Sequence, residues 1–341
     1  MTPNESYYRR VTGAIGFTML LFVLLSNVFA MAALFLGEIL TVTAPSTAAT
    51  VGYQIFYAAG YMLAFMLPVL LLRALIRRRY PYQSMQVFNL PSPWTLLLLP
   101  VIVTVIFSAS RINATFVNIV RYVPLSAEQT ADNVIRAPQG FEWVLEMIVS
   151  CVVPGICEEF LFRGAIQTNC RPFGRVNAVL IASFLFSMMH QNPAQILYTF
   201  VAGILLGVVY EKTNSLLTCS VLHIFNNLAA TCEDMFFYGI ENPFSSSSAM
   251  LAFEIALFIP GVIGLVIFAV RLSREDRSLR QGIFERDLSA SDGYASHPIS
   301  SVSARRLFLA PSMVIFLAIV ALELIFLMLV NYGILKIPTP Y

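Results

Sequence analysis

Long apolar runs, separated by short polar segments, recur along most of the chain. Nine of these runs have roughly the 17 to 25 residues that a helix needs to cross a hydrocarbon core of about 30 Å. Because lipid offers the backbone no hydrogen-bond partner, each run must be helical where it lies in the membrane. The pattern therefore predicts an all-α fold, a polytopic membrane bundle of about nine transmembrane helices. The spans are expected at residues 14–38, 51–72, 94–110, 142–168, 176–191, 195–211, 215–232, 248–270 and 307–331.

The composition also indicates a membrane protein. Of the 341 residues, 58% are hydrophobic and only 12% are charged, and the mean hydropathy is +0.75. These values lie outside the usual range of a soluble domain. The first apolar run is longer than the 7 to 15 residues of a signal-peptide core, so we expect a retained helix. Membrane lipids are the expected surroundings, and no nucleic-acid partner is expected.

The distribution of basic residues predicts an orientation. With the N-terminus on the cytoplasmic side, sixteen of the 21 Lys and Arg residues fall in cytoplasmic segments. Positive charge in short loops favours the cytoplasmic face of a membrane. The sequence thus predicts a multi-pass protein with its N-terminus cytoplasmic and its C-terminus outside, in a cell membrane. The compact build and the lack of organelle-retention signals favour a bacterial plasma membrane.

The polar residues at membrane depth divide the chain into three predicted regions. Residues 1–140 hold the N-terminal transmembrane helices, and nothing in them suggests chemistry. Residues 141–232 hold four spans with short connections and most of the polar residues that fall within spans. Residues 233–341 hold the C-terminal helices and a charged, Ser-rich cytoplasmic linker at 271–306. The middle region is therefore the predicted functional core.

The stretch "CEEFLFRGAI", at residues 157–166, places three ionisable groups in the fourth span. A charged side chain at mid-membrane costs about 2.5 to 3.5 kcal/mol, so such groups need a reason. Glu159 and Arg163 are four positions apart on one helix face, which predicts an ion pair. Glu158 points about 100° away and has no cation near it in sequence. It is the free carboxylate, suited to accept a proton as a general base.

Two histidines fall in the spans that follow. His190 ends the fifth span. Phe186 lies four residues before it, where its aromatic ring can pack against the imidazole. His223 lies in the seventh span. Asn227 is four residues later on the same helix face, and Asn226, at three residues, competes for the same role. Taken singly, each histidine also fits an ordinary hydrogen bond between helices. Together with the paired glutamates, they predict one reactive site.

Small residues in the same region predict close helix packing. Gly203 and Gly207 form a small-xxx-small face on the sixth span, which lets helix backbones approach one another. Pro154 and Gly155 lie one turn before Glu158 and are expected to loosen the fourth helix and admit water. His190 falls near the end of a short span, so a shared site requires that span to be tilted or kinked.

Three motifs in this region resemble a known family. "EEFLFRG" from Glu158, "FSMMH" ending at His190, and "HIFNN" from His223 are similar to EExxxR, FxxxH and HxxxN of the CAAX-protease and bacteriocin-processing (CPBP) family of intramembrane proteases, which includes type II CAAX prenyl endopeptidases. The resemblance covers residues 141–232. It implies a four-helix catalytic core and an enzyme that hydrolyses a peptide bond of a membrane-anchored, in some members lipidated, protein or peptide.

The resemblance also implies roles for individual residues. Glu158 and His190 would activate the attacking water, while Glu159 with Arg163 would brace the site. His223 and Asn227 would hold the oxyanion or complete a metal site.

The choice between a metal-dependent and a metal-free mechanism stays open at this point. Glu158, His190 and His223 would satisfy a catalytic Zn²⁺ with an open water position, although they do not form an HExxH motif. Without a metal, Glu158 would deprotonate water, and His223 with Asn227 would stabilise the oxyanion. We favour the metal-free version slightly because it gives both residues of HxxxN a role.

Two other classes of function remain open. One is a non-proteolytic membrane factor, such as a bacteriocin-immunity or scaffolding protein, as some members of the family are thought to be. The other is a proton-coupled transporter, which uses buried Glu and His relays. Many transporters are built from inverted repeats, and we find no internal repeat in the sequence. The endopeptidase is therefore the favoured hypothesis, with no expectation for the oligomeric state.

Overall fold

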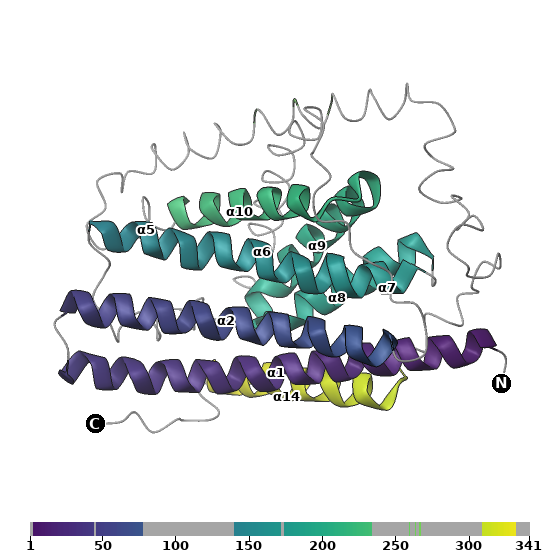
Figure 1. The fold of residues 1–341 in the computed structure, drawn as a ribbon, viewed down its shortest axis with the longest axis horizontal. Helices are drawn as coiled ribbons and strands as arrows, with labels where there is room; N and C mark the ends of the chain where they lie inside the picture. The colour runs from purple at the N-terminus through teal and green to yellow at the C-terminus, as the bar shows by residue number, and fades with distance from the viewer. Residues whose placement is uncertain are drawn as a thin grey trace.

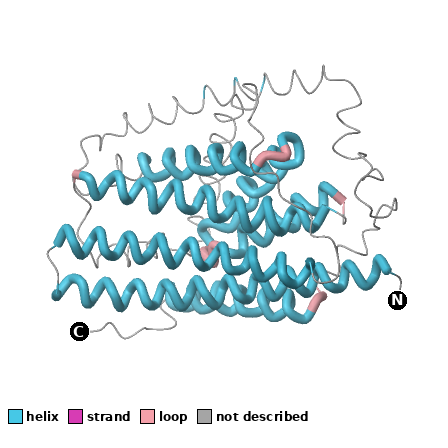
Figure 2. Tube along the Cα trace, viewed as in Figure 1, coloured by secondary structure: helices cyan, strands magenta, loops and turns pink. Residues whose placement is uncertain are grey.

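The computed structural model gives an all-helical structure over the residues it describes. Within these residues no strand occurs, and Figure 2 shows helices joined by short loops. The predicted all-α fold class is confirmed. The described residues are 3–43, 46–77, 140–171, 174–233 and 309–331, with the single residues 259, 263 and 266.

Helices from both ends of the chain form one side of the bundle. α1 (Pro3–Thr43) and α2 (Ser46–Arg77) make a long helical hairpin, and α14 (Pro311–Asn331) packs along α1. Figure 1 shows the three helices side by side, with α14 in yellow beneath α1 in purple. Buried apolar side chains of these helices belong to the same core cluster as those of the central helices. α2 is packed directly against the predicted functional core, and α1 and α14 lie behind it.

The central helices form the other side of the bundle. A long helix from Phe141 to Cys170 lies against α2, and α10 (Leu216–Glu233) covers its opposite side. Figure 1 shows this order as successive layers: α10, the 141–170 helix, α2 and α1. α8 (Arg175–Met189) and α9 (Pro193–Thr213) pack on each other and on the second half of the 141–170 helix. The 141–170 helix is therefore enclosed by neighbours on several sides.

The 141–170 helix widens into π-helical turns in two places. Its α-helical parts α5 (Phe141–Met147), α6 (Val153–Glu159) and α7 (Thr168–Cys170) are separated by the π-helical segments Ile148–Val152 and Phe160–Gln167. Such wide turns occur often at functional sites. The paired glutamates are the last two residues of α6, directly between the wide turns.

Three glycines set the closest approaches between the central helices. A methyl group on Gly155 would lie 2.6 Å from Cγ1 of Ile224 in α10, and one on Gly203 would lie 2.9 Å from Cα of Ser183 in α8. A methyl group on Gly207 would lie 3.0 Å from Oε1 of Gln167. The expected close packing at Gly203 and Gly207 is confirmed. Gly155, expected to loosen its helix, is instead a contact point with α10.

The described helices are those of a multi-pass membrane protein, but the predicted number of spans is not confirmed. By length and composition, three helices can cross a membrane, at Arg9–Leu40, Thr47–Arg77 and Gln195–Thr213. Shorter apolar helices lie at Arg175–Met189, Leu216–Thr231 and Pro311–Leu327. Outside the described residues lie the predicted span 94–110, nearly all of the span 248–270 and the linker 271–306. The division into three regions stays a prediction.

Candidate active site

A buried ion pair forms the base of the site. Nη1 of Arg163 donates to Oε1 of Glu159 at 2.7 Å, and both side chains are at most 1% exposed. Nη2 of the same guanidinium donates to the backbone oxygen of Gly203 in α9 at 3.2 Å. The guanidinium also lies over the ring of Phe186, 4.6 Å from its centroid. The predicted pairing of Glu159 with Arg163 is thus present, and it ties the 141–170 helix to α8 and α9.

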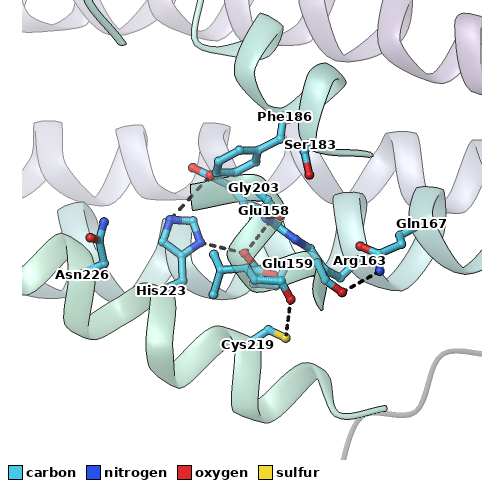
Figure 3. A network of polar contacts seen from close by, with 12 residues as sticks. Glu158, Glu159, Arg163, Gln167, Ser183, Phe186, Gly203, Cys219, His223 and Asn226 are labelled. Carbon is cyan, nitrogen blue, oxygen red and sulfur yellow. Dashed lines mark hydrogen bonds and ion pairs between the residues drawn. The ribbon is translucent and has the colours of Figure 1, made fainter. Parts of the chain in front are cut away.

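The imidazole of His223, from α10, lies between the two glutamates. Its Nδ1 is 2.8 Å from Oε1 of Glu159, and its Nε2 is 3.8 Å from Oε2 of Glu158. Figure 3 shows the ring facing both carboxylates. A carboxylate only accepts hydrogen bonds, so Nδ1 carries the hydrogen, and Nε2 is an acceptor whenever the ring is neutral. Two residues on different faces of one helix therefore meet the same ring.

A tyrosine of α2 binds the other glutamate, Glu158. Glu158 is 4% exposed, and its Oε1 accepts a hydrogen bond from the hydroxyl of Tyr61. Its Oε2 is buried and has no hydrogen-bond partner. We did not predict Tyr61 as a site residue. The sequence contains one signal that could have found it, since Tyr53, Tyr57 and Tyr61 recur every four residues and so line one face of a helix.

Phe186 joins the two predicted histidines. Nδ1 of His190 lies 2.8 Å from the backbone oxygen of Phe186, and the two rings meet edge to face at 5.0 Å. The ring of Phe186 is also 5.8 Å from that of His223. Phe186 therefore packs against the imidazole of His190, as predicted, and also contacts the imidazole of His223. His190 follows the last residue of α8, and Gln191 then turns the chain with a φ of 52°.

His190 lies near the other candidate residues although it is at a helix end. The ring of Phe186 contacts both His190 and His223. The family resemblance pairs Glu158 with His190, whereas the closest imidazole nitrogen that the structure gives for Glu158 is Nε2 of His223, at 3.8 Å. The role of each histidine stays a prediction.

The two predicted asparagines contact each other at the edge of the site. Nδ2 of Asn226 lies 3.4 Å from Oδ1 of Asn227, and both side chains are half-buried. Oδ1 of Asn226 is buried without a hydrogen-bond partner. The bond between them uses the oxygen of Asn227 and leaves its NH₂ group as a donor. Which of the two acts in the site stays a prediction.

The predicted metal ligands do not form a metal site in this arrangement. Among the described residues, no group of three or more His, Cys, Asp or Glu side chains is placed to hold a metal ion. Nδ1 of His190 is bonded to a backbone oxygen and Nδ1 of His223 to a carboxylate, a pattern also found in metal-binding histidines, which then bind through Nε2. Whether a metal takes part in the reaction stays open.

A family model matches the segment that carries this site. Residues 140–229 match the family described as Type II CAAX prenyl endopeptidase Rce1-like. The matched segment includes Glu158, Glu159, His190 and His223, but not α2. No curated protein and no solved structure was found to match the chain. The match supports a membrane-embedded protease of the CAAX endopeptidase type in general.

Proposed function

We propose, from the match of residues 140–229 to a family of prenyl endopeptidases, that this chain is an intramembrane endopeptidase that uses Glu158 as its general base. One observation carries the mechanism. The buried Oε2 of Glu158 has no hydrogen-bond partner and faces Nε2 of His223 at 3.8 Å. In the proposed mechanism, a water molecule takes a place about 2.8 Å from each of these two acceptors and donates one hydrogen to each. Its lone pairs are then directed toward a peptide carbonyl.

In the proposed reaction, one carboxyl group takes a proton and later returns it. Glu158 accepts a proton from water while the water oxygen bonds to the carbonyl carbon and electrons move onto the carbonyl oxygen. The protonated Glu158 then gives its proton to the amide nitrogen as the C–N bond breaks. One water is consumed, a carboxyl and an amino terminus are formed, and Glu158 returns to its starting state.

Glu159 acts in this mechanism through His223. A carboxylate at Nδ1 fixes the tautomer and the orientation of an imidazole, so that Nε2 points to the reacting group. Arg163 is bonded to the same oxygen of Glu159 and compensates its charge. The chain from Arg163 through Glu159 to His223 therefore holds Nε2 toward the proposed water. His190 supplies a second imidazole on the other side of Phe186.

The tetrahedral oxyanion needs hydrogen-bond donors that are already in place. We propose the NH₂ group of Asn227 as one donor, with Asn226 as the competing residue. The support is the bond between these two amides, which occupies the oxygen of Asn227. Asn226 is then a residue that orients its neighbour.

For the cofactor, we propose a metal-free reaction, with Zn²⁺ held by Glu158, His190 and His223 as the competing version. The metal-free version is favoured because it gives both residues of the HxxxN motif, His223 and Asn227, a role in the reaction. When bound at such a site, Zn²⁺ would lower the pKa of a bound water.

For the substrate, we propose a membrane-anchored protein or peptide cleaved near its carboxyl end. The family description names prenylated CAAX substrates, so a prenylated tail is the first class to test. We also propose that the N-terminus is cytoplasmic and the C-terminus outside, in a bacterial plasma membrane. Protease protection of terminal tags in sealed membrane vesicles tests that orientation.

The proposed function is tested with the purified full-length protein in phosphatidylcholine vesicles. The probes are two internally quenched peptides, one with a farnesylated CAAX end and one with the same sequence anchored by a transmembrane helix. We expect cleavage of at least one probe by the wild-type protein, and its loss in Glu158→Gln and in His223→Ala. Glu211→Gln is the matched control, because it removes a carboxylate that pairs with Arg171 at 3.0 Å and is not bonded to Glu158 or His223.

Size-exclusion profiles and thermal unfolding establish that each variant is folded. Full turnover in both Glu158→Gln and His223→Ala would overturn the proposed mechanism. A folded wild-type protein that cleaves neither probe would favour the non-proteolytic hypothesis. Proton movement across the vesicle membrane that depends on Glu158 would favour the transporter.

A further inference from the structure

The carboxylate proposed as the base has two oxygens in different surroundings. Oε1 of Glu158 accepts the hydroxyl of Tyr61, while Oε2 has no hydrogen-bond partner and faces His223. A glutamate side chain has three rotatable bonds, so its carboxylate can adopt several orientations unless a neighbour holds it. A bond to one oxygen reduces the orientations that the other oxygen can adopt. The hydrogen bond from Tyr61 to Oε1 therefore limits the directions in which Oε2 can point.

The ring of Tyr61 is itself held in place. It stacks on Phe65 at 4.7 Å and contacts the ring of Tyr57 at 6.1 Å. Tyr57 in turn stacks on Tyr53 at 6.3 Å, so four aromatic rings form a continuous row along α2. A functional group keeps its geometry best when the residues behind it are fixed by packing. The row gives the hydroxyl of Tyr61 a fixed position relative to the helix.

The rotation of α2 is fixed on its far side. A methyl group on Gly60, the residue before Tyr61, would lie 3.0 Å from the ring of Phe29 in α1. The contact at Gly60 therefore brings α1 and α2 close together. Successive residues of a helix point about 100° apart, so position 61 lies on a different face of α2 from Gly60. From that face Tyr61 reaches Glu158 in α6, against which α2 also packs.

We propose that Tyr61 of α2 is a positioning residue for Glu158: its hydroxyl binds Oε1 and so turns Oε2 toward Nε2 of His223. This inference rests on the proposed function, because it matters only if Glu158 is the base. It extends the site beyond residues 140–229, the segment that matches the family model. The N-terminal helices then contribute a side chain to the reaction and are not only a scaffold.

The test compares Tyr61→Phe with Tyr210→Phe in the vesicle assay with the two peptide probes. Both variants lose one buried phenol hydroxyl, because Tyr210 bonds to Thr168 at 2.9 Å, but only Tyr61 bonds to Glu158. We expect Tyr61→Phe to lower kcat about 10- to 100-fold, the usual effect of one hydrogen bond to a charged group. KM should stay within about twofold, since a base acts in the transition state rather than in binding. Tyr210→Phe should leave both constants unchanged.

A second measurement needs no substrate. Dicyclohexylcarbodiimide labels buried carboxyl groups, and mass spectrometry gives the labelling rate of Glu158 in each protein. We expect this rate to rise several-fold in Tyr61→Phe, because Oε1 is then free to react, and to stay unchanged in Tyr210→Phe. Incorporation of 4-aminophenylalanine at position 61, which restores an N–H donor, should recover part of kcat.

The outcomes separate this inference from the proposed function. If Glu158→Gln is inactive while Tyr61→Phe keeps the wild-type kcat and labelling rate, Tyr61 does not position the carboxylate. A raised KM with an unchanged kcat would instead assign Tyr61 to substrate binding, and would also overturn the inference. If Glu158→Gln is fully active, the proposed function itself fails. If Tyr61→Phe does not fold, the 4-aminophenylalanine protein decides: a low kcat there contradicts the inference.

Discussion

Nδ1 of His223 lies 2.8 Å from Oε1 of Glu159, the same oxygen that accepts Nη1 of Arg163 at 2.7 Å. One carboxylate oxygen therefore receives a hydrogen bond from a cation on its own helix and from an imidazole on another helix. Because all three side chains are buried, solvent cannot replace either donor without a large cost. Glu159 thus couples the stability of the 141–170 helix to the orientation of the imidazole.

A neutral amide in place of Glu159 should damage both stability and activity. Glu159→Gln leaves the buried Arg163 without its counter-charge, and removing one partner of a buried ion pair costs about 3 to 5 kcal/mol. His223 also loses the acceptor that fixes its tautomer. We expect a clearly lower thermal-unfolding temperature and, in the folded fraction, a large loss of kcat.

The control for this change is Glu211→Gln. Glu211 is also a glutamate with a largely buried side chain, paired with Arg171 at 3.0 Å, but it lies outside the site. Its replacement should lower the unfolding temperature and leave the kcat of the folded protein unchanged. Equal kcat in the two variants would contradict a role for Glu159 beyond folding.

A methyl group at position 155 should separate α6 from α10. In Gly155→Ala, the new carbon would lie 2.6 Å from Cγ1 and 3.0 Å from the backbone nitrogen of Ile224, the residue after His223. Overpacking of this kind costs about 1 to 3 kcal/mol and is relieved by backbone shifts. We expect kcat to fall because His223 moves away from the glutamates, and thermal unfolding together with vesicle assays measures both effects.

Gly13→Ala is the comparison for that variant. A methyl group on Gly13, within α1, would meet no atom within 4 Å. Alanine is favoured over glycine in a helix by about 1 kcal/mol, so the unfolding temperature should stay the same or rise. If Gly155→Ala behaves like Gly13→Ala, the close approach of α6 and α10 does not set the position of His223.

Loss of the aromatic ring at Phe186 should affect the site more than the fold. The ring lies under Arg163 and contacts both His190 and His223. Phe186→Leu keeps an apolar side chain of similar size but removes these ring contacts, which are worth about 0.5 to 2 kcal/mol each. We expect a marked drop in kcat with a moderate loss of stability. Phe316→Leu, at a fully buried ring in α14, should lower stability alone. Matching kcat values in the two variants would contradict this role.

Zinc analysis distinguishes the two versions of the reaction. In the metal-free version, purified protein that cleaves the probe contains well under one zinc per chain, and 1,10-phenanthroline leaves its activity unchanged. Zinc close to one per chain, lost in His190→Ala or His223→Ala, would overturn that version. Elemental analysis of the same samples used for activity gives both results together.

Local spacing predicted those features that depend on a single helix. The apolar runs predicted the helical bundle, because length and hydropathy alone determine what can lie in lipid. The separation of four residues predicted the pair of Glu159 and Arg163, since helical geometry places such residues on one face. Phe186 and His190 follow the same rule. None of these required knowledge of how the helices pack.

Contacts between helices could not be predicted in the same way. Tyr61 and Glu158 are 97 positions apart, and nothing in either helix indicates which neighbour it faces. The regular spacing of tyrosines in α2 marks a helix face but not its partner. Helical spacing predicted that Glu158 and Glu159 point in different directions. That both contact His223 depends on the position of α10, which the spacing does not give. These relationships follow from packing, which the sequence pattern does not specify.

The two π-helical segments that flank α6 determine where the 141–170 helix can gain or lose a residue. Adding one residue to an ordinary α-helix turns everything beyond it by about 100°, whereas a π turn accommodates the extra residue locally. A single-residue deletion within Ile148–Val152 can therefore be absorbed, and the two flanking parts keep their phase. The same deletion inside Val153–Glu159 would rotate the glutamates relative to their neighbours. We thus expect related chains to vary in length at the wide turns and not between them.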